Sequence, residues 1–122
     1  MKRTILFATL TFLAVTQRAS AVPGTQLQEA CANYTDNSTT SNTSSVSSLN
    51  AGICMGYIMS AIDSYPIINV AYPTVKFCAP KEVDYAQEIK VVTKFLNNHP
   101  EVLHKPATML VIAAMSIAFP CK

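Results

Sequence analysis

Apolar residues fill positions 107–118 almost without interruption, since only Thr108 and Ser116 are polar among these twelve residues. A helix that is apolar on nearly every side has to be buried on every side. The run is too short to cross a bilayer, which takes about 20 apolar residues. The pattern therefore predicts the core helix of a small soluble domain, ended by Phe119 and Pro120.

Three further segments have the pattern of helices that would cover this core. Residues 25–32 form a short one, and residues 46–64 form a longer one that stops before Pro66, because the residue before a proline resists the α region. A third begins near Asp84, which has capping-box spacing to Gln87. Its apolar face carries Tyr85, Ile89, Val92 and Leu96. The predicted fold class is all-α, a small four-helix domain.

Two segments between these helices have a different composition. Residues 33–48 are rich in Ser, Thr and Asn, whose side chains compete with the backbone for hydrogen bonds, so we expect a flexible loop. Residues 64–80 contain three prolines and are predicted to be irregular. They are too apolar for a linker, so they either pack over the core or form an exposed binding segment.

The predicted helix 46–64 carries small residues at every fourth position, namely Gly52, Gly56 and Ser60. Glycine inside a helix costs about 1 kcal/mol relative to alanine, so close packing against this strip is the expected compensation. The partner is either another helix of the same chain or a second copy of the protein.

The first residues are typical of a secretory signal peptide. Lys2 and Arg3 form a charged head, residues 5–16 are apolar, and residues 19–21 read Ala-Ser-Ala, so we expect cleavage after Ala21. Residues 1–21 are thus predicted to be the signal peptide and residues 22–122 a single exported domain without a membrane segment. This domain has six lysines against seven acids, a formal charge of −1, which does not favour nucleic acid binding.

Four cysteines, Cys31, Cys54, Cys78 and Cys121, lie in the exported part. An even number in an oxidising compartment predicts two disulfides rather than free buried thiols. The helices before and after residues 97–105 should be antiparallel because their connection is short. That arrangement places Cys78 beside Cys121, and the same reasoning for the first two helices pairs Cys31 with Cys54.

The chemistry of an enzyme is not evident in this sequence. It contains no G-x-S-x-G, no H-E-x-x-H and no glycine-rich phosphate loop. His99 and His104 lie in a proline-bounded corner where hydrogen bonding at a helix end is the expected role, and Asp63 is expected to be buried or to cap a helix. We therefore predict no catalytic residue, no cofactor and no metal.

Four sequence blocks in fixed order resemble the Rap/Tai immunity proteins of bacterial type VI secretion. They are CMGYIM at 54–59, FCAP at 77–80, VVTKFLNNHPE at 91–101 and AFPC at 118–121. The resemblance implies a periplasmic, all-helical homodimer that inhibits a peptidoglycan amidase toxin by blocking its active-site cleft. The alternative is a general periplasmic binding or chaperone-like protein. Small disulfide-bonded helical proteins of acid resistance are of this kind, but they should be rich in side chains that titrate at low pH, and the exported part of this chain has only seven acids.

We expect the contact with the toxin at residues 65–72, because this stretch offers tyrosines and branched aliphatic side chains outside regular helix, which are suitable interface anchors. The alternative is that these side chains only cap the core. The predicted contact residues are Tyr65, Ile67, Ile68, Asn69 and Tyr72.

Overall fold

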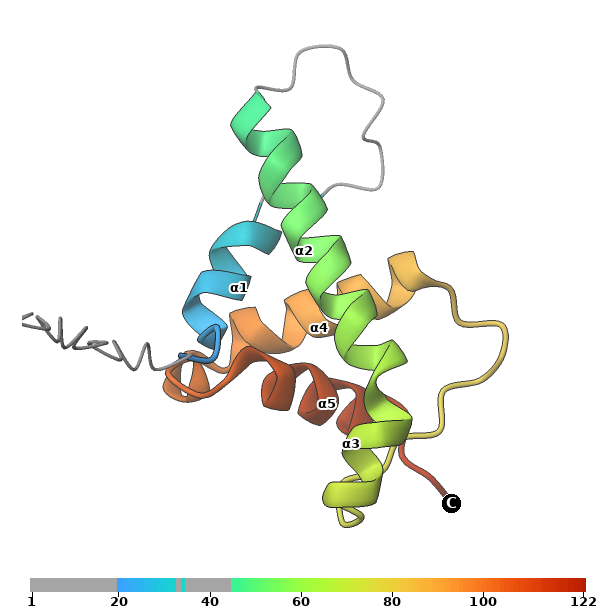
Figure 1. Ribbon diagram of the computed structural model, residues 1–122. Coiled ribbons are helices and arrows are strands. Elements are labelled where there is room, and N and C mark those ends of the chain that lie inside the picture. Colours follow the sequence, from blue (N-terminus) through green and yellow to red (C-terminus); the bar gives the residue numbers. More distant parts are fainter. Residues whose placement is uncertain (1–19, 33, 35–44) are drawn as a thin grey trace, which may run out of the picture.

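The computed structural model describes residues 20–32, 34 and 45–122 (Figure 1). Most of the predicted signal peptide and most of the predicted loop 33–48 lie outside these residues. The described chain is helical and contains no strand of a sheet, which confirms the all-α class. Its elements are α1 (Gly24–Cys31), α2 (Ser45–Asp63), α3 (Tyr65–Ala71), α4 (Tyr85–Asn98), the short 3-10 turn η1 (Pro100–Val102) and α5 (Ala107–Ala118).

Four of these helices agree closely with the prediction, but the count of four was one too low. The additional helix is α3, in the segment 64–80 that was predicted to be irregular. Pro66 does not prevent it because it lies in the first turn, where the backbone N–H has no partner inside the helix. The predicted loop was also too long, since residues 45–48 belong to the first turn of α2.

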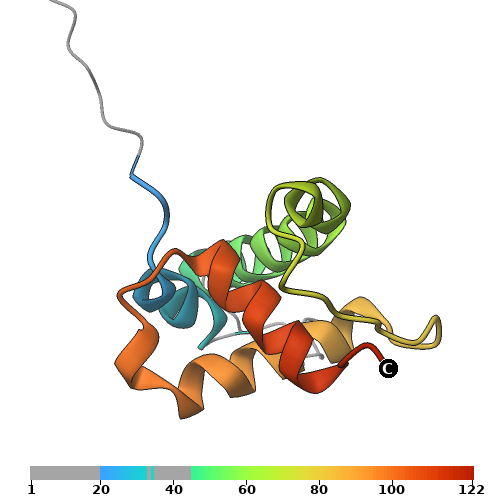
Figure 2. The same ribbon diagram turned by 90° about the horizontal axis from the view of Figure 1, so that it is seen from below.

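The core lies where α5 packs against α4, α2 and α1 (Figure 2). α5 is not buried on every side, contrary to the prediction, because Met109 and Ile117 are exposed. The covering helices reach only part of its circumference. The largest fully buried side chains come from all four helices: Leu27, Ile58, Ile89, Leu96, Met115, Val92, Val111, Cys31 and Cys54.

The start of α1 is fastened to the corner that leads into α5. The N–H groups of Gly24 and Thr25 donate to the carbonyls of Lys105 (2.9 Å) and Leu103 (3.0 Å). The N–H of Ala107 donates to the Val22 carbonyl at 2.8 Å. A Cβ atom at residue 24 would lie only 2.9 Å from the Leu103 carbonyl oxygen and closer still to a methyl of the Leu110 side chain. Glycine is therefore required for this close approach.

Both disulfides of the structure join the cysteines paired in the sequence-based prediction. Cys31–Cys54 links α1 to α2, and Cys78–Cys121 links the segment before α4 to the residues after α5. They close loops with sequence separations of 23 and 43 residues. By loop-closure entropy each contributes about 3 to 4 kcal/mol. One link thus joins the first two helices, and the other joins the segment before α4 to the C-terminal end of the chain.

The substitution Gly24→Ala should destabilise the fold, because the added methyl meets the Leu103 backbone and Leu110. We expect a loss of about 1 to 3 kcal/mol in the free energy of unfolding, the usual range for overpacking. Urea denaturation of the oxidised protein measures it. Thr25→Ala, at an exposed neighbouring position, is the matched control and should change stability by less than about 0.5 kcal/mol. Equal stability of Gly24→Ala and the parent would contradict the close packing at this junction.

Candidate partner-binding surface

The predicted contact residues lie on α3, which follows α2 at the end of the domain away from α1 (Figure 1). Three side chains here point into solvent: Ile67 is 77%, Val70 84% and Tyr72 67% exposed. Ile67 and Val70 are three residues apart and share one face of the helix, and Tyr72 follows at its C-terminal cap. We call Ile67, Val70 and Tyr72 the α3 patch. Val70 was not among the predicted contacts, and helical i, i+3 spacing would have found it.

The other predicted contact residues face the domain to a larger extent. The ring of Tyr65 lies against Phe77, with ring centroids 4.2 Å apart. Its hydroxyl accepts from the Phe77 N–H (3.2 Å) and donates to the Val75 carbonyl (3.4 Å). Ile68 and Asn69 are half-buried. Tyr65 therefore fastens the segment after α3 to the helix, and the α3 patch is presented by a supported element.

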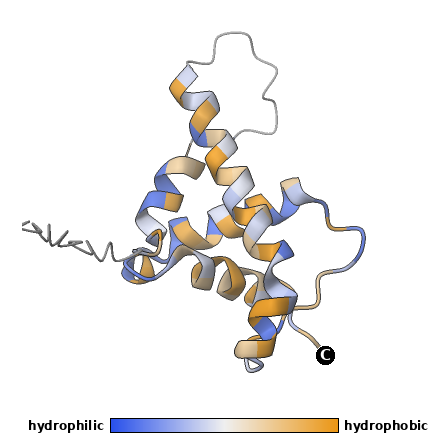
Figure 3. Cartoon of the chain, viewed as in Figure 1, coloured by the Kyte–Doolittle hydropathy of each residue, from blue (hydrophilic) through white to orange (hydrophobic). Residues whose placement is uncertain are grey.

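A second apolar surface runs along α2. Only Cys54, Ile58 and Ala61 of its 19 residues are buried, and its exposed side chains include Val46, Leu49, Ile53 and Met55. Figure 3 shows hydrophobic positions along much of this helix. Among the described helices α2 is the one long and apolar enough, by length and composition, to cross a membrane, a property that core helices and signal sequences share.

The glycines of α2 lie in the open part of this surface. A Cβ atom at Gly52 or Gly56 would meet nothing within 4 Å among the described residues. The interpretation of the small-residue strip as a crossing point within the chain is therefore wrong. No described helix of the same chain packs there, so the strip is available to another molecule.

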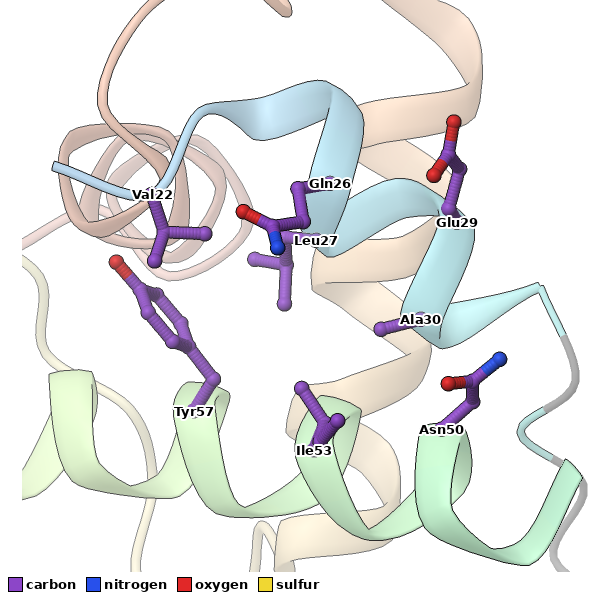
Figure 4. Close-up of a pocket in the computed structure, with 8 residues that line it drawn as sticks. All are labelled: Val22, Gln26, Leu27, Glu29, Ala30, Asn50, Ile53 and Tyr57. Atoms are coloured by element: carbon purple, nitrogen blue, oxygen red, sulfur yellow. The ribbon is translucent and has the colours of Figure 1, made fainter. Parts of the chain in front are cut away.

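A pocket of about 250 Å³ lies between α1 and α2 (Figure 4). Leu27, Ala30 and Ile53 give it apolar walls, and Tyr57 bounds it near Val22. The Tyr57 hydroxyl is 3.0 Å from the hydroxyl of Thr108 on α5. The remaining lining residues are Gln26, Glu29 and Asn50. Apolar walls with a single carboxylate can receive an aliphatic side chain, but they do not form a catalytic constellation.

Three acidic side chains gather where α2 ends and α4 begins. Asp84 caps α4 by accepting the Gln87 N–H at 2.8 Å, and Asp63 accepts weakly from the Tyr85 hydroxyl at 3.5 Å. Glu88 is only 8% exposed, and its Oε2 atom has no hydrogen-bond partner among the residues that the structure describes. Burial raises the pKa of Glu88, and the charges of Asp63 and then Asp84 raise it further. Asp63 itself is exposed, so the first of its two predicted roles, a buried side chain, is wrong.

The described His, Cys, Asp and Glu side chains do not gather into a possible metal site. Within residues 20–32, 34 and 45–122, no group of three His, Cys, Asp or Glu side chains could hold a metal ion. The Nδ1 atom of His99 lies 2.9 Å from the Phe95 carbonyl at the end of α4, which is the helix-end role predicted from the sequence. His104 is exposed. The notable feature of this molecule is thus its exposed apolar surface.

A family model described as Rap1a immunity proteins matches residues 23–121 of the chain. The matched range includes α1 to α5 and all four cysteines. No curated protein matches the chain.

Glu88 gives a prediction about the pH dependence of stability. The pKa of the Glu88 carboxyl is raised in the folded state. Such a group lowers the free energy of unfolding as the pH rises, and the loss begins near its unfolded-state pKa and is complete above its folded-state pKa. Glu88→Gln removes this charge, so the variant should be more stable than the parent at pH 7. The difference should shrink as the pH falls toward 4. Thermal unfolding over this pH range measures it, with the exposed Glu82→Gln as control. A Glu88→Gln protein less stable than the parent at pH 7 would contradict the assignment.

Proposed function

We propose that this chain, which belongs to the Rap1a immunity protein family, is an exported protein that neutralises a type VI secretion effector by binding it. The effector we propose is a peptidoglycan amidase, and inhibition consists of occupying its active-site cleft. The protein contributes no chemistry of its own. The observation that carries the proposal is the α3 patch, because a family whose members act on a partner protein needs an exposed surface that can bind one.

The α3 patch is suited to be the centre of such a contact. Its side chains are apolar or aromatic, and such residues in the middle of an interface carry a large share of the binding energy. The helix that presents them is fastened through Tyr65 to Phe77, so little conformational entropy is lost on binding. Silencing a toxin requires a dissociation constant in the nanomolar range, which corresponds to a binding free energy of about −12 kcal/mol. A few well-placed anchors can supply much of it.

The proposed compartment is the periplasm, reached through cleavage after Ala21. Two features support it. The first residues have the charged head, apolar stretch and small-residue site of a signal peptide. The domain also depends on two disulfides, and these persist in oxidising compartments. Val22, directly after the proposed site, accepts a hydrogen bond from the Ala107 N–H, and cleavage after Ala21 would keep this contact.

We also propose a homodimer formed through α2. The exposed strip at Gly52 and Gly56 would let a second α2 approach closely, with Val46, Leu49 and Ile53 beside it. α2 contains no lysine or arginine, and its one acid is Asp63 at the end. A membrane-surface helix normally carries basic residues on its polar face, so a protein partner fits this helix better than a lipid surface.

Binding is tested with the mature protein, its N-terminus verified as Val22 by mass spectrometry, and a candidate peptidoglycan amidase effector. We expect nanomolar affinity and loss of peptidoglycan cleavage. Val70→Ala and Tyr72→Ala should each weaken binding by about tenfold or more, because truncation of a hot-spot residue costs about 2 kcal/mol or more. Lys94→Ala, on the exposed side of α4, is the control and should bind like the parent.

Two results of this experiment would count against the proposal in different ways. Undiminished cleavage at saturating protein would end the immunity function for this pair. Inhibition with unchanged affinity in both folded α3 variants would place the contact elsewhere, with α2 and the corner at residues 97–105 as the next surfaces to test.

The dimer is tested by Gly52→Leu and Gly56→Leu in sedimentation equilibrium. Each leucine has open space among the described residues of the single chain and a better helix propensity than glycine, so the fold should be kept or stabilised by up to about 1 kcal/mol. The same side chain would hold two α2 helices apart, so dimerisation should weaken at least tenfold. Lys94→Leu on α4 serves as control. A parent that stays monomeric at high concentration would refute the dimer, and unweakened variant dimers would exclude this seam.

A further inference from the structure

The two disulfides of this domain lie in opposite environments. Cys31 and Cys54 are 2% and 0% exposed and belong to the core, whereas Cys78 and Cys121 are both exposed. Thiol–disulfide exchange requires a thiolate to reach a sulfur atom, so access controls which bond is attacked first. A reductant in solution can therefore reach Cys78–Cys121 in the native fold and cannot reach Cys31–Cys54 without opening the core.

The segments joined by the exposed disulfide contribute little to the core. No residue of 72–84 or of 119–122 is buried, although Phe77 and Phe119 are half-buried at its edge. One backbone hydrogen bond accompanies the disulfide, from the Cys78 N–H to the Phe119 carbonyl at 2.8 Å. Segments with few buried contacts open locally at low free energy. Once the disulfide is broken, both segments can leave while α1, α2, α4 and α5 remain packed.

The exposed disulfide also supports the α3 patch. Phe77, the residue before Cys78, lies against the Tyr65 ring of α3, and its N–H donates to the Tyr65 hydroxyl. The loop beyond Tyr72 is held on its other side by the link to Cys121. Freeing Cys78 therefore loosens the Phe77 contact that fixes the start of α3.

We propose that Cys78–Cys121 is a redox-sensitive clamp that sets how firmly the α3 patch is presented, while Cys31–Cys54 keeps the core folded in either state. A dithiol reductant opens the clamp in two steps. One thiolate of the reductant attacks a sulfur of the disulfide, forms a mixed disulfide and releases the other cysteine as a thiol. The second thiol of the reductant then attacks the reductant's sulfur in the mixed disulfide and releases the remaining cysteine. The products are free thiols at Cys78 and Cys121 and a disulfide in the reductant. The oxidised clamp holds the patch ready for the partner. This last step rests on the proposed function.

The first test needs no partner. Native oxidised protein is treated with graded dithiothreitol, quenched with N-ethylmaleimide and mapped by peptide mass spectrometry. We expect Cys78 and Cys121 to be labelled at least about tenfold faster than Cys31 and Cys54, with the helical circular dichroism retained. Labelling of all four at one rate, earlier labelling of Cys31 and Cys54, or no labelling before global unfolding would overturn the clamp.

The second test separates the clamp from a merely structural disulfide. The Cys78→Ser/Cys121→Ser double variant should stay folded, with faster amide hydrogen exchange in residues 65–84 and unchanged exchange in α4 and α5. Its affinity for the amidase should fall about tenfold or more relative to the oxidised parent. Equal exchange in residues 65–84, or equal affinity where the parent binds, would overturn the link to the α3 patch. A parent that binds no amidase refutes the proposed function, and the labelling and exchange results still decide the clamp.

Discussion

Burial of α5 is the interaction on which the rest of this domain depends. Its apolar residues would be unstable in water, and α4, α2 and α1 provide the surfaces that cover them. The position of α5 is fixed at both ends. At its start, residues 103–107 are hydrogen-bonded to the first turn of α1 at Gly24, and after its end Cys121 is linked to Cys78. The helices that surround α5 owe their arrangement to these constraints.

A core of this size cannot cover all the apolar surface of the chain, and the uncovered part is not randomly distributed. It lies along α2, on α3 and on the outer side of α5, while polar groups occupy the corner between α4 and α5. Exposed apolar side chains lower solubility and do not stabilise the monomer, so their concentration on neighbouring helices indicates surfaces that bind other proteins. The same scarcity of core contacts explains why the loop 72–84 and the C-terminus need a disulfide to hold them.

Features encoded by local sequence were predictable, and features decided by tertiary contacts were not. The bounds of α5 and the capping of α4 by Asp84 follow from residues a few positions apart. The disulfide pairs follow from the antiparallel order of helices. In contrast, the prolines of residues 64–80 led to the prediction of an irregular segment where α3 forms. Nothing local shows that Tyr65 packs on Phe77, or that Gly52 and Gly56 have no neighbour among the described residues. The exposed face of α3 could not be predicted because the segment was expected to be irregular, and helical i, i+3 spacing applies only once α3 is known to be a helix. That this segment contacts the toxin stays a prediction.

Binding of a partner protein through the α3 patch can be tested by hydrogen–deuterium exchange of the oxidised protein, measured with and without the proposed amidase partner. Amides in the interface lose contact with solvent and exchange more slowly in the complex. If the α3 patch forms the contact, exchange should slow in residues 65–72, with little change in the corner at residues 97–105. Slower exchange confined to that corner or to α1, with residues 65–72 unaffected, would contradict it.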